Sequence, residues 1–315
     1  MSFIPHDPAA PHTDADDLMI GVPMAALADD AAPEEEFVEK RLGWGFWVSI
    51  AWLVTIVSLA ILAPVLPIDD PQDPASQFVN DPRLAPSSEA WLGADELGRD
   101  VLAQVIWGAR VSLTVGFAAI VFGLLVGGTA GILAGFLRGR TDGVISSFFV
   151  VMLAFPPLVL AILITSTLER KLIWIALTLG ILAVAPVGRL ARANTLAWSE
   201  REFVTAARSM GAKSGRIMVR EILPNVLIPM GALALLGMAL AIVAEGGLAF
   251  LALSVPPDEA SSWGNMISRG TSGNNLEDMP WLAFSAIGAM FLTVLALNYA
   301  GDRVREYTDV KDLAL

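Results

Sequence analysis

The sequence predicts an all-α membrane protein whose chain crosses a bilayer six times. Of its 315 residues, 55% are hydrophobic and only 17% are charged, which is too apolar a composition for an ordinary soluble domain of this length. The mean hydropathy of +0.63 also indicates a membrane protein. Six apolar stretches separated by polar segments are each long enough to cross the hydrocarbon core at about 1.5 Å per residue. An even number of crossings places both termini on the same side of the membrane.

The polar start of the chain, residues 1–43, is predicted to be a disordered tail. It carries ten acidic residues against Lys40 and Arg41. Such a self-repelling segment cannot bury a core. It lacks the basic start and short apolar run of a secretory signal, so we expect the first span to be retained. The chain has no cysteine, and both histidines, His6 and His12, lie in this tail, which excludes disulfides, thiolate chemistry and an intramembrane histidine metal cluster.

The first expected span covers residues 44–67. Trp44 and Trp47 suit headgroup depth at its start, and Pro64 and Pro67 close it. The next segment, 68–110, is rich in Asp, Pro and Ser, and it is too long and hydrophilic to stay in lipid. We expect it to lie in water outside the membrane.

The second and third expected spans cover residues 111–137 and 144–164. In the second, four glycines spaced by four form one face of small residues, which favours close helix packing over a conduction path. In the third, Pro156 and Pro157 remove two backbone donors and predict a kink, which could serve as a gating hinge or be static. The four glycines are Gly123, Gly127, Gly131 and Gly135.

The remaining expected spans are 172–187, 226–253 and 281–300. The fifth carries Glu245, the lone membrane carboxylate, close to Gly246 and Gly247, which we expect to break the helix. A structural cap or gate hinge is favoured for Glu245 over direct contact with cargo. The five spans from the second onward would form a core over residues 111–301, which includes a cytoplasmic loop at 189–225, and residues 302–315 would be a cytoplasmic tail.

The basic residues orient these spans. With both tails inside, fourteen of the twenty Lys and Arg side chains lie on the cytoplasmic side and six lie outside. The 189–225 loop is therefore expected to face the cytoplasm, where ATP is available to a partner protein.

This loop contains two short helical patterns. Phe203, Ala206, Ala207 and Met210 share one apolar face at helical spacing, and Gly211 ends that pattern. A second short helix is expected to follow and to stop at Pro224. Two small helices joined at a glycine would form a compact knob that fits a groove on another protein; the alternative is a loop whose basic face lies on anionic lipid.

The same residues resemble a known motif. The order Ala206, Ala207, Gly211 and a segment ending in Leu223 and Pro224 resembles the EAA loop in permease subunits of bacterial ATP-binding cassette (ABC) importers. ARSMGA followed by EILPN is similar to the dipeptide, oligopeptide and nickel branch of that family. Further blocks agree in the same order: LGADELGRDVLAQVIWGARVSLTVG (92–116), AFPPL (154–158), AEGGLAFLALSVPP (244–257), SWGNMI (262–267) and LNYAGDRVRE (297–306).

The resemblance implies a type I ABC importer permease fold in the plasma membrane of a prokaryote. It implies uptake of dipeptides or oligopeptides, with nickel or another small solute as the alternative. The implied partners are a second homologous permease, two cytoplasmic ATPase subunits and an extracytoplasmic substrate-binding protein, besides membrane lipid and without nucleic acid. The implied site residues are Glu202, Ala206, Ala207, Met210, Gly211, Leu223 and Pro224 for ATPase docking; Pro156, Pro157 and Glu245 for the gate or pathway; and Arg99, Asp100 and Trp263 for the binding-protein dock.

The sequence shows no enzyme site of its own. It contains no GxxxxGK[ST] phosphate loop, and the GAKSG run at 211–215 lacks the required spacing. HExxH and a cysteine nucleophile are also missing. We therefore expect this chain to bind no cofactor or metal, with ATP and Mg²⁺ used by the ATPase subunits. A function of another class, an ATP-independent channel or membrane scaffold, would not need the glycine-jointed loop.

Overall fold

A computed structural model describes residues 42–313 of the chain, with side chains to residue 307. Apart from its last two residues, the predicted acidic tail lies outside the described residues. The part described is helical, and its only strand-like pairing is a single bridge between Ala94 and Asp100. The helices are α1 (Gly43–Leu62), α2 (Val101–Gly123), α3 (Thr129–Leu137), α4 (Gly139–Ala154), α5 (Pro157–Thr167), α6 (Leu172–Ser199), α7 (Glu202–Ser209), α8 (Ser214–Ile217), α9 (Leu223–Phe250), α10 (Trp263–Gly270), α11 (Asn275–Asp278) and α12 (Pro280–Leu313).

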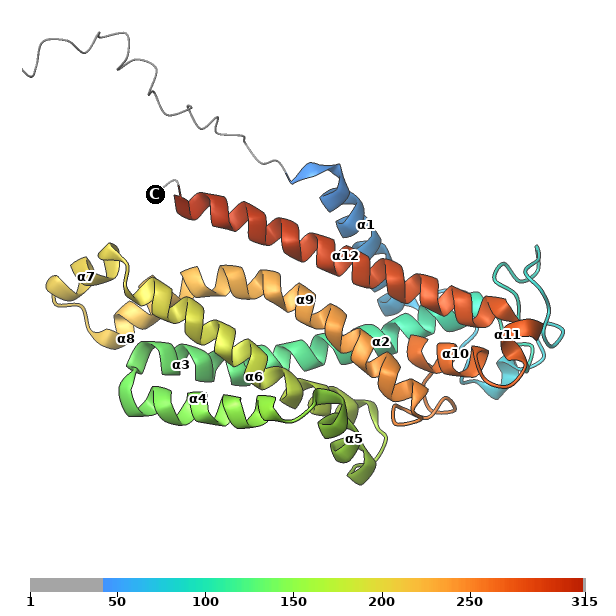
Figure 1. The fold of residues 1–315 in the computed structure, drawn as a ribbon. Helices are drawn as coiled ribbons and strands as arrows, with labels where there is room; N and C mark the ends of the chain where they lie inside the picture. Colours follow the sequence, from blue (N-terminus) through green and yellow to red (C-terminus); the bar gives the residue numbers. More distant parts are fainter. Residues whose placement is uncertain (1–41, 314–315) are drawn as a thin grey trace, which may run out of the picture. The chain divides into compact units, whose positions relative to one another are not determined.

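The described part of the chain has five spans, and a sixth, as predicted, if one sharply bent helix pair counts as a single span. Five continuous helical segments are long and apolar enough to span a membrane: 43–62, 101–137, 172–199, 214–250 and 280–307. The sixth is the α4–α5 pair, which is bent by 86°. The long helices run side by side, with α7 and α8 at one end of the bundle and α10 and α11 at the other (Figure 1).

The second span starts at Val101, ten residues earlier than predicted. Asp100 caps it, because its carboxylate accepts a hydrogen bond of 3.0 Å from the Leu102 N–H. The first turns of α2 are buried against α9 and α10. This stretch is thus stabilised by the protein interior, and hydropathy alone places the helix start too late.

Short π-helical turns connect two pairs of helices. η2 (Leu124–Gly128) joins α2 to α3, and η3 (Met218–Ile222) joins α8 to α9. A short 3₁₀ turn, η1 (Pro74–Ser76), lies in the polar segment. Because the π turns widen the helix without ending it, each pair forms one continuous rod.

The glycine face of the second span packs directly on α6. From Gly123 to Gly135, a β-carbon added at any of the four glycines would crowd the facing helix. At three of them it would meet a backbone carbonyl oxygen, so the two helix backbones approach closely. The facing pairs are Gly127 with Val184, Gly131 with Gly188 and Gly135 with Arg192.

Gly131→Ala is expected to lower the thermal unfolding midpoint of the purified chain, because the new methyl group would collide with the Gly188 carbonyl. Overpacking of this kind costs about 1–3 kcal/mol. Gly128→Ala is the matched control, since nothing lies within 4 Å of the position that its β-carbon would take. Equal unfolding midpoints for the two variants would contradict the close approach of α3 and α6.

The proline pair produces the predicted kink. α4 ends at Ala154, Phe155 and Pro156 are extended, and Pro157 begins α5. Proline suits that first position, where a helix N–H has no internal partner. Most of the residues flanking the kink are exposed in the described chain.

Two other boundaries differ from the sequence-based expectation. α6 continues to Ser199, twelve residues beyond the predicted end at 187. α9 continues to Phe250, so Gly246 and Gly247 do not break it. In both places packing against neighbouring helices supports residues whose local preference is weak.

Candidate functional site

The loop between α6 and α9 folds as two short helices around Gly211. Gly211 has a φ of +80°, a left-handed conformation that glycine adopts without strain. The Ala212 N–H donates to the Ala207 carbonyl at 3.0 Å, and the Gly211 N–H donates to the Arg208 carbonyl at 2.9 Å. This pair of bonds is a Schellman closure of α7. The glycine thus sets the angle between α7 and α8.

The inner side of the loop is anchored to the bundle. Val204 and Ala207 of α7 and Ile217 of α8 are buried in one apolar cluster with Ile222 and Met230. Side chains of α6 complete this cluster. The two short helices are therefore held by burial at the end of the bundle.

The outer side of the loop presents apolar surface that nothing in the described chain covers. Met210 is 82% exposed and Phe203 39% exposed. Ala206 and Gly211 are exposed between them. An apolar, convex surface of this kind is typical of a protein contact.

One expectation for the orientation of α7 is wrong. Ala207 does not share the exposed face with Phe203, Ala206 and Met210; it points inward beside Val204, because the inner stripe of α7 faces the bundle. Glu202 lies exposed in the first turn of α7.

The chain also does not end a helix at Pro224. α8, η3 and α9 are continuous, with Pro224 exposed in the first turn of α9 and Leu223 half-buried. The π turn explains this difference. The Leu223 N–H donates to the Met218 carbonyl five residues back, and this wider spacing accommodates a residue that has no N–H.

Ion pairs that no sequence pattern indicates stabilise the base of the loop. Arg192 of α6 makes a forked contact with Asp142 of α4, with N–O distances of 2.5 and 2.6 Å. Arg138 pairs with Glu200 at 3.0 Å. These pairs connect the α3–α4 turn to the end of α6. Only spatial proximity across about fifty residues identifies them.

An aromatic contact fixes the turn from α6 into α7. The rings of Trp198 and Phe203 lie 6.1 Å apart, and the Arg201 guanidinium lies 5.3 Å from the Trp198 ring. The loop therefore leaves α6 in a defined direction.

Glu245 lies fully buried near the opposite end of α9. Its carboxylate accepts hydrogen bonds from the Ser254 hydroxyl at 2.7 Å and the Ser112 hydroxyl at 3.3 Å. The Ser112 hydroxyl oxygen in turn accepts from the Trp263 N–H at 3.2 Å. Glu245 thus connects α2, α9 and the start of α10, and in this conformation no part of it is open to cargo.

The three residues predicted for a binding-protein dock differ in exposure: Arg99 and Asp100 directly precede α2, and Trp263 begins α10. Trp263 is fully buried and donates its indole N–H to the Val105 carbonyl at 2.9 Å. Arg99 and Asp100 are half-buried. Partial burial raises the pKa of the Asp100 carboxyl above its usual value, against the opposing effect of the Leu102 N–H. Direct contact with another protein is therefore open to Arg99 and Asp100 only.

A buried carboxylate links the polar segment before α2 to the start of α2 and to α10. Asp95 is 1% exposed and accepts hydrogen bonds from Arg99 Nε at 3.1 Å and Gln104 Nε2 at 3.0 Å. Arg269 of α10 lies 3.4 Å from the same carboxylate and donates to Gln104 Oε1 at 2.5 Å. No pattern in the sequence marks Asp95, Gln104 or Arg269 as a cluster, because a single acid in a polar segment is usually solvated.

The family follows from comparison with known proteins. Residues 127–309 match the family model described as "Binding-protein-dependent transport system inner membrane component". This range covers more than half of the chain. The chain belongs to this family.

Several relatives carry the name of a permease subunit. The permease is 35% identical over 264 residues to the dipeptide transport system permease protein DppC of Alkalihalophilus pseudofirmus, covering 84% of this chain and 86% of the relative. It is 31% identical to the oligopeptide transport system permease protein OppC of Bacillus subtilis, covering 92% and 96%. A glutathione transport system permease protein, GsiD of Pectobacterium atrosepticum, is 32% identical, with 82% and 85% covered.

A solved structure has the same fold. The permease matches a chain of the MetNI methionine ABC transporter in an inward-facing conformation with a TM-score of 0.53 at 18% identity, covering 65% of the permease and 97% of that chain. The expected type I importer fold is confirmed. The permease is a multi-pass membrane protein of an ABC importer family.

Proposed function

We propose that this permease forms half of the translocation pathway of an importer for dipeptides or oligopeptides. Its relatives carry peptide transport in their names. The proposal further assigns the α7–α8 loop to a cleft on a cytoplasmic ATPase, places both termini in the cytoplasm and adds an extracytoplasmic substrate-binding protein. The observation that carries it is the exposed apolar surface around Gly211 on an anchored, glycine-jointed loop.

The transport step follows from the way this loop is connected. α7 continues from α6 by a short turn, and α8 runs without a break into α9. Two such permeases, each docked on one ATPase, would move together when the ATPases close on ATP. The membrane helices would then shift between inward-open and outward-open states, a population shift between two conformations. The chain itself hydrolyses nothing in this scheme.

Uptake assays test the proposed cargo. In cells that lack this chain, uptake of a labelled dipeptide or a labelled longer peptide is expected to fall to background and to return when the chain is restored. Labelled nickel is the comparison, because it is the other cargo of the branch that the motifs resemble. Loss and rescue of nickel uptake alone would contradict a peptide cargo, and unchanged uptake of every solute would contradict both.

A further inference from the structure

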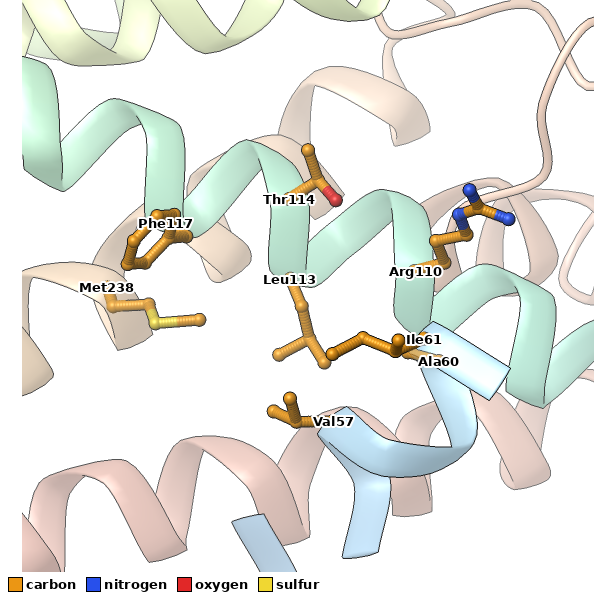
Figure 2. Close-up of a pocket in the computed structure, with 8 residues that line it drawn as sticks. All are labelled: Val57, Ala60, Ile61, Arg110, Leu113, Thr114, Phe117 and Met238. Carbon is orange, nitrogen blue, oxygen red and sulfur yellow. The ribbon is translucent and has the colours of Figure 1, made fainter. Parts of the chain in front are cut away.

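A lateral groove of about 470 Å³ opens between α1, α2 and α9 (Figure 2). Ala60 and Leu113 are buried at its base. Ile61 of α1 and Phe117 of α2 line it and are both more than half exposed. All three helices belong to spans that can cross a membrane. The main body of any occupant must therefore be apolar.

One cation stands at an end of this apolar groove. Arg110 lies on the same stripe of α2 as Leu113, Thr114 and Phe117, as Figure 2 shows. Its guanidinium lies 5.8 Å from the Trp107 ring and makes no ion pair within the described part of the chain. The groove thus combines an apolar lining with the exposed positive charge of Arg110, which has no anionic partner in the described part of the chain.

Arg110 lies near the boundary between the hydrocarbon core and the headgroups if the second span is centred in the bilayer. The apolar rod from Val101 to Leu137 has 37 residues and is about 55 Å long, so it exceeds the core of about 30 Å by roughly 13 Å at each end, and Arg110 lies about 14 Å along the helix from Val101. Ile61, which lines the same groove, is the second-last residue of α1, where the first span ends. Both helices therefore place this end of the groove at the membrane surface.

The groove lies at the edge of the bundle. α1 packs only on α12 and α2 among its major neighbours, and one of its faces is exposed. Because an exposed face of α1 borders the groove, surrounding lipid is the medium nearest to it.

We propose that this groove binds one anionic phospholipid from the leaflet at the α10 end of the bundle. The phosphate would lie at Arg110, whose planar fork of donors matches phosphate oxygens. One acyl chain would run along Ile61, Leu113 and Phe117. A helix from a partner subunit would fill the apolar part but would leave the Arg110 charge uncompensated unless it brought an acid.

Two measurements on the full-length chain in nanodiscs test this proposal. The first uses a photoactivatable phosphatidylglycerol, and peptide mapping should place the cross-links on residues 57–61 and 110–117 of the unmodified chain. The second is native mass spectrometry of retained phosphatidylglycerol. Arg110→Gln should reduce retention roughly tenfold or more, because it removes a charged hydrogen-bond donor. Ala60→Phe, which fills the base of the groove, should do the same, whereas Arg110→Lys, which keeps the charge without the planar fork, should lose less lipid than Arg110→Gln.

Two control variants distinguish lipid bound in the groove from lipid that contacts the rest of the protein surface. Val54→Phe enlarges an exposed side chain of α1 that does not line the groove, and Arg170→Gln removes another exposed arginine. Both should retain lipid like the unmodified chain. Cross-links spread evenly over the exposed faces, or equal retention in Arg110→Gln and Arg170→Gln, would overturn the proposal. Capture of a partner permease by a photoreactive amino acid placed at position 61, in place of a lipid cross-link, would also overturn it.

Discussion

Gly211→Asp is expected to reduce ATP-coupled uptake at least tenfold while the chain stays in the membrane at its normal level. Gly211 is exposed, and nothing lies within 4 Å of the position of an added β-carbon, so the carboxylate would point into open space. Asp tolerates a positive φ better than most residues, so the turn itself should survive. The loss would come from burying an unpaired charge against the apolar surface of a docked partner.

Two variants identify the reason for such a loss. Gly211→Asn keeps the side-chain shape and the left-handed preference without the charge, and it should retain more uptake than Gly211→Asp. Gly215→Asp adds the same charge four residues later at another open position, outside the exposed apolar surface. It should leave uptake within about twofold of normal. Full uptake by Gly211→Asp in cells would disprove docking through this loop.

Asp95→Asn is expected to cost about 3–5 kcal/mol of stability, the range for removing one partner of a buried ion pair. The asparagine amide would aim its own N–H groups at Arg99, Gln104 and Arg269, which are all donors to the present carboxylate. Two guanidinium groups would also be left without their common anion. The measurement is the thermal unfolding midpoint of the purified chain together with proteolysis of the 68–100 segment.

Asp278→Asn provides the control for this variant. Asp278 pairs with Arg83 at 3.1 Å at the same end of the bundle, but both side chains are about half exposed. Exposed pairs contribute only about 0–1 kcal/mol, so this variant should melt close to the unmodified chain. Similar unfolding midpoints for Asp95→Asn and Asp278→Asn would show that the buried carboxylate does not organise the outer segments.

The sequence predicted the membrane-spanning architecture well because hydropathy and glycine spacing are local signals. Six crossings, the proline kink and the close-packed glycine face are all visible along the chain itself. The start of α2 at Val101 is not, because that stretch gains its burial from α9 and α10, which come more than a hundred residues later. A cap at Asp100 was the available local sign.

The candidate site was predicted in outline but not in orientation. Helical spacing grouped Ala207 with Met210, yet the structure turns Ala207 inward and Met210 outward. Helical spacing defines the apolar face of a helix only to within about a quarter turn. Which residues at the border of that face are buried depends on how the helix packs against the bundle. The Arg192–Asp142 contact and the Asp95 cluster join segments far apart in sequence, so no pattern along one segment could have revealed them.

The unbroken course of the chain from α8 into α9 has a mechanical consequence. Residues 214–250 form one rod of 37 residues, about 55 Å long, with the exposed loop surface at one end and the buried Glu245 cluster near the other. If the loop and α9 were joined flexibly, a displacement of the loop would not move α9. Because they form one rod, the same displacement would tilt the whole rod and move its end at the other side of the membrane. The π turn at η3 and Pro229 inside α9 are the two places where this rod can bend, so their stiffness would govern how much of a displacement of the loop reaches the Glu245 end.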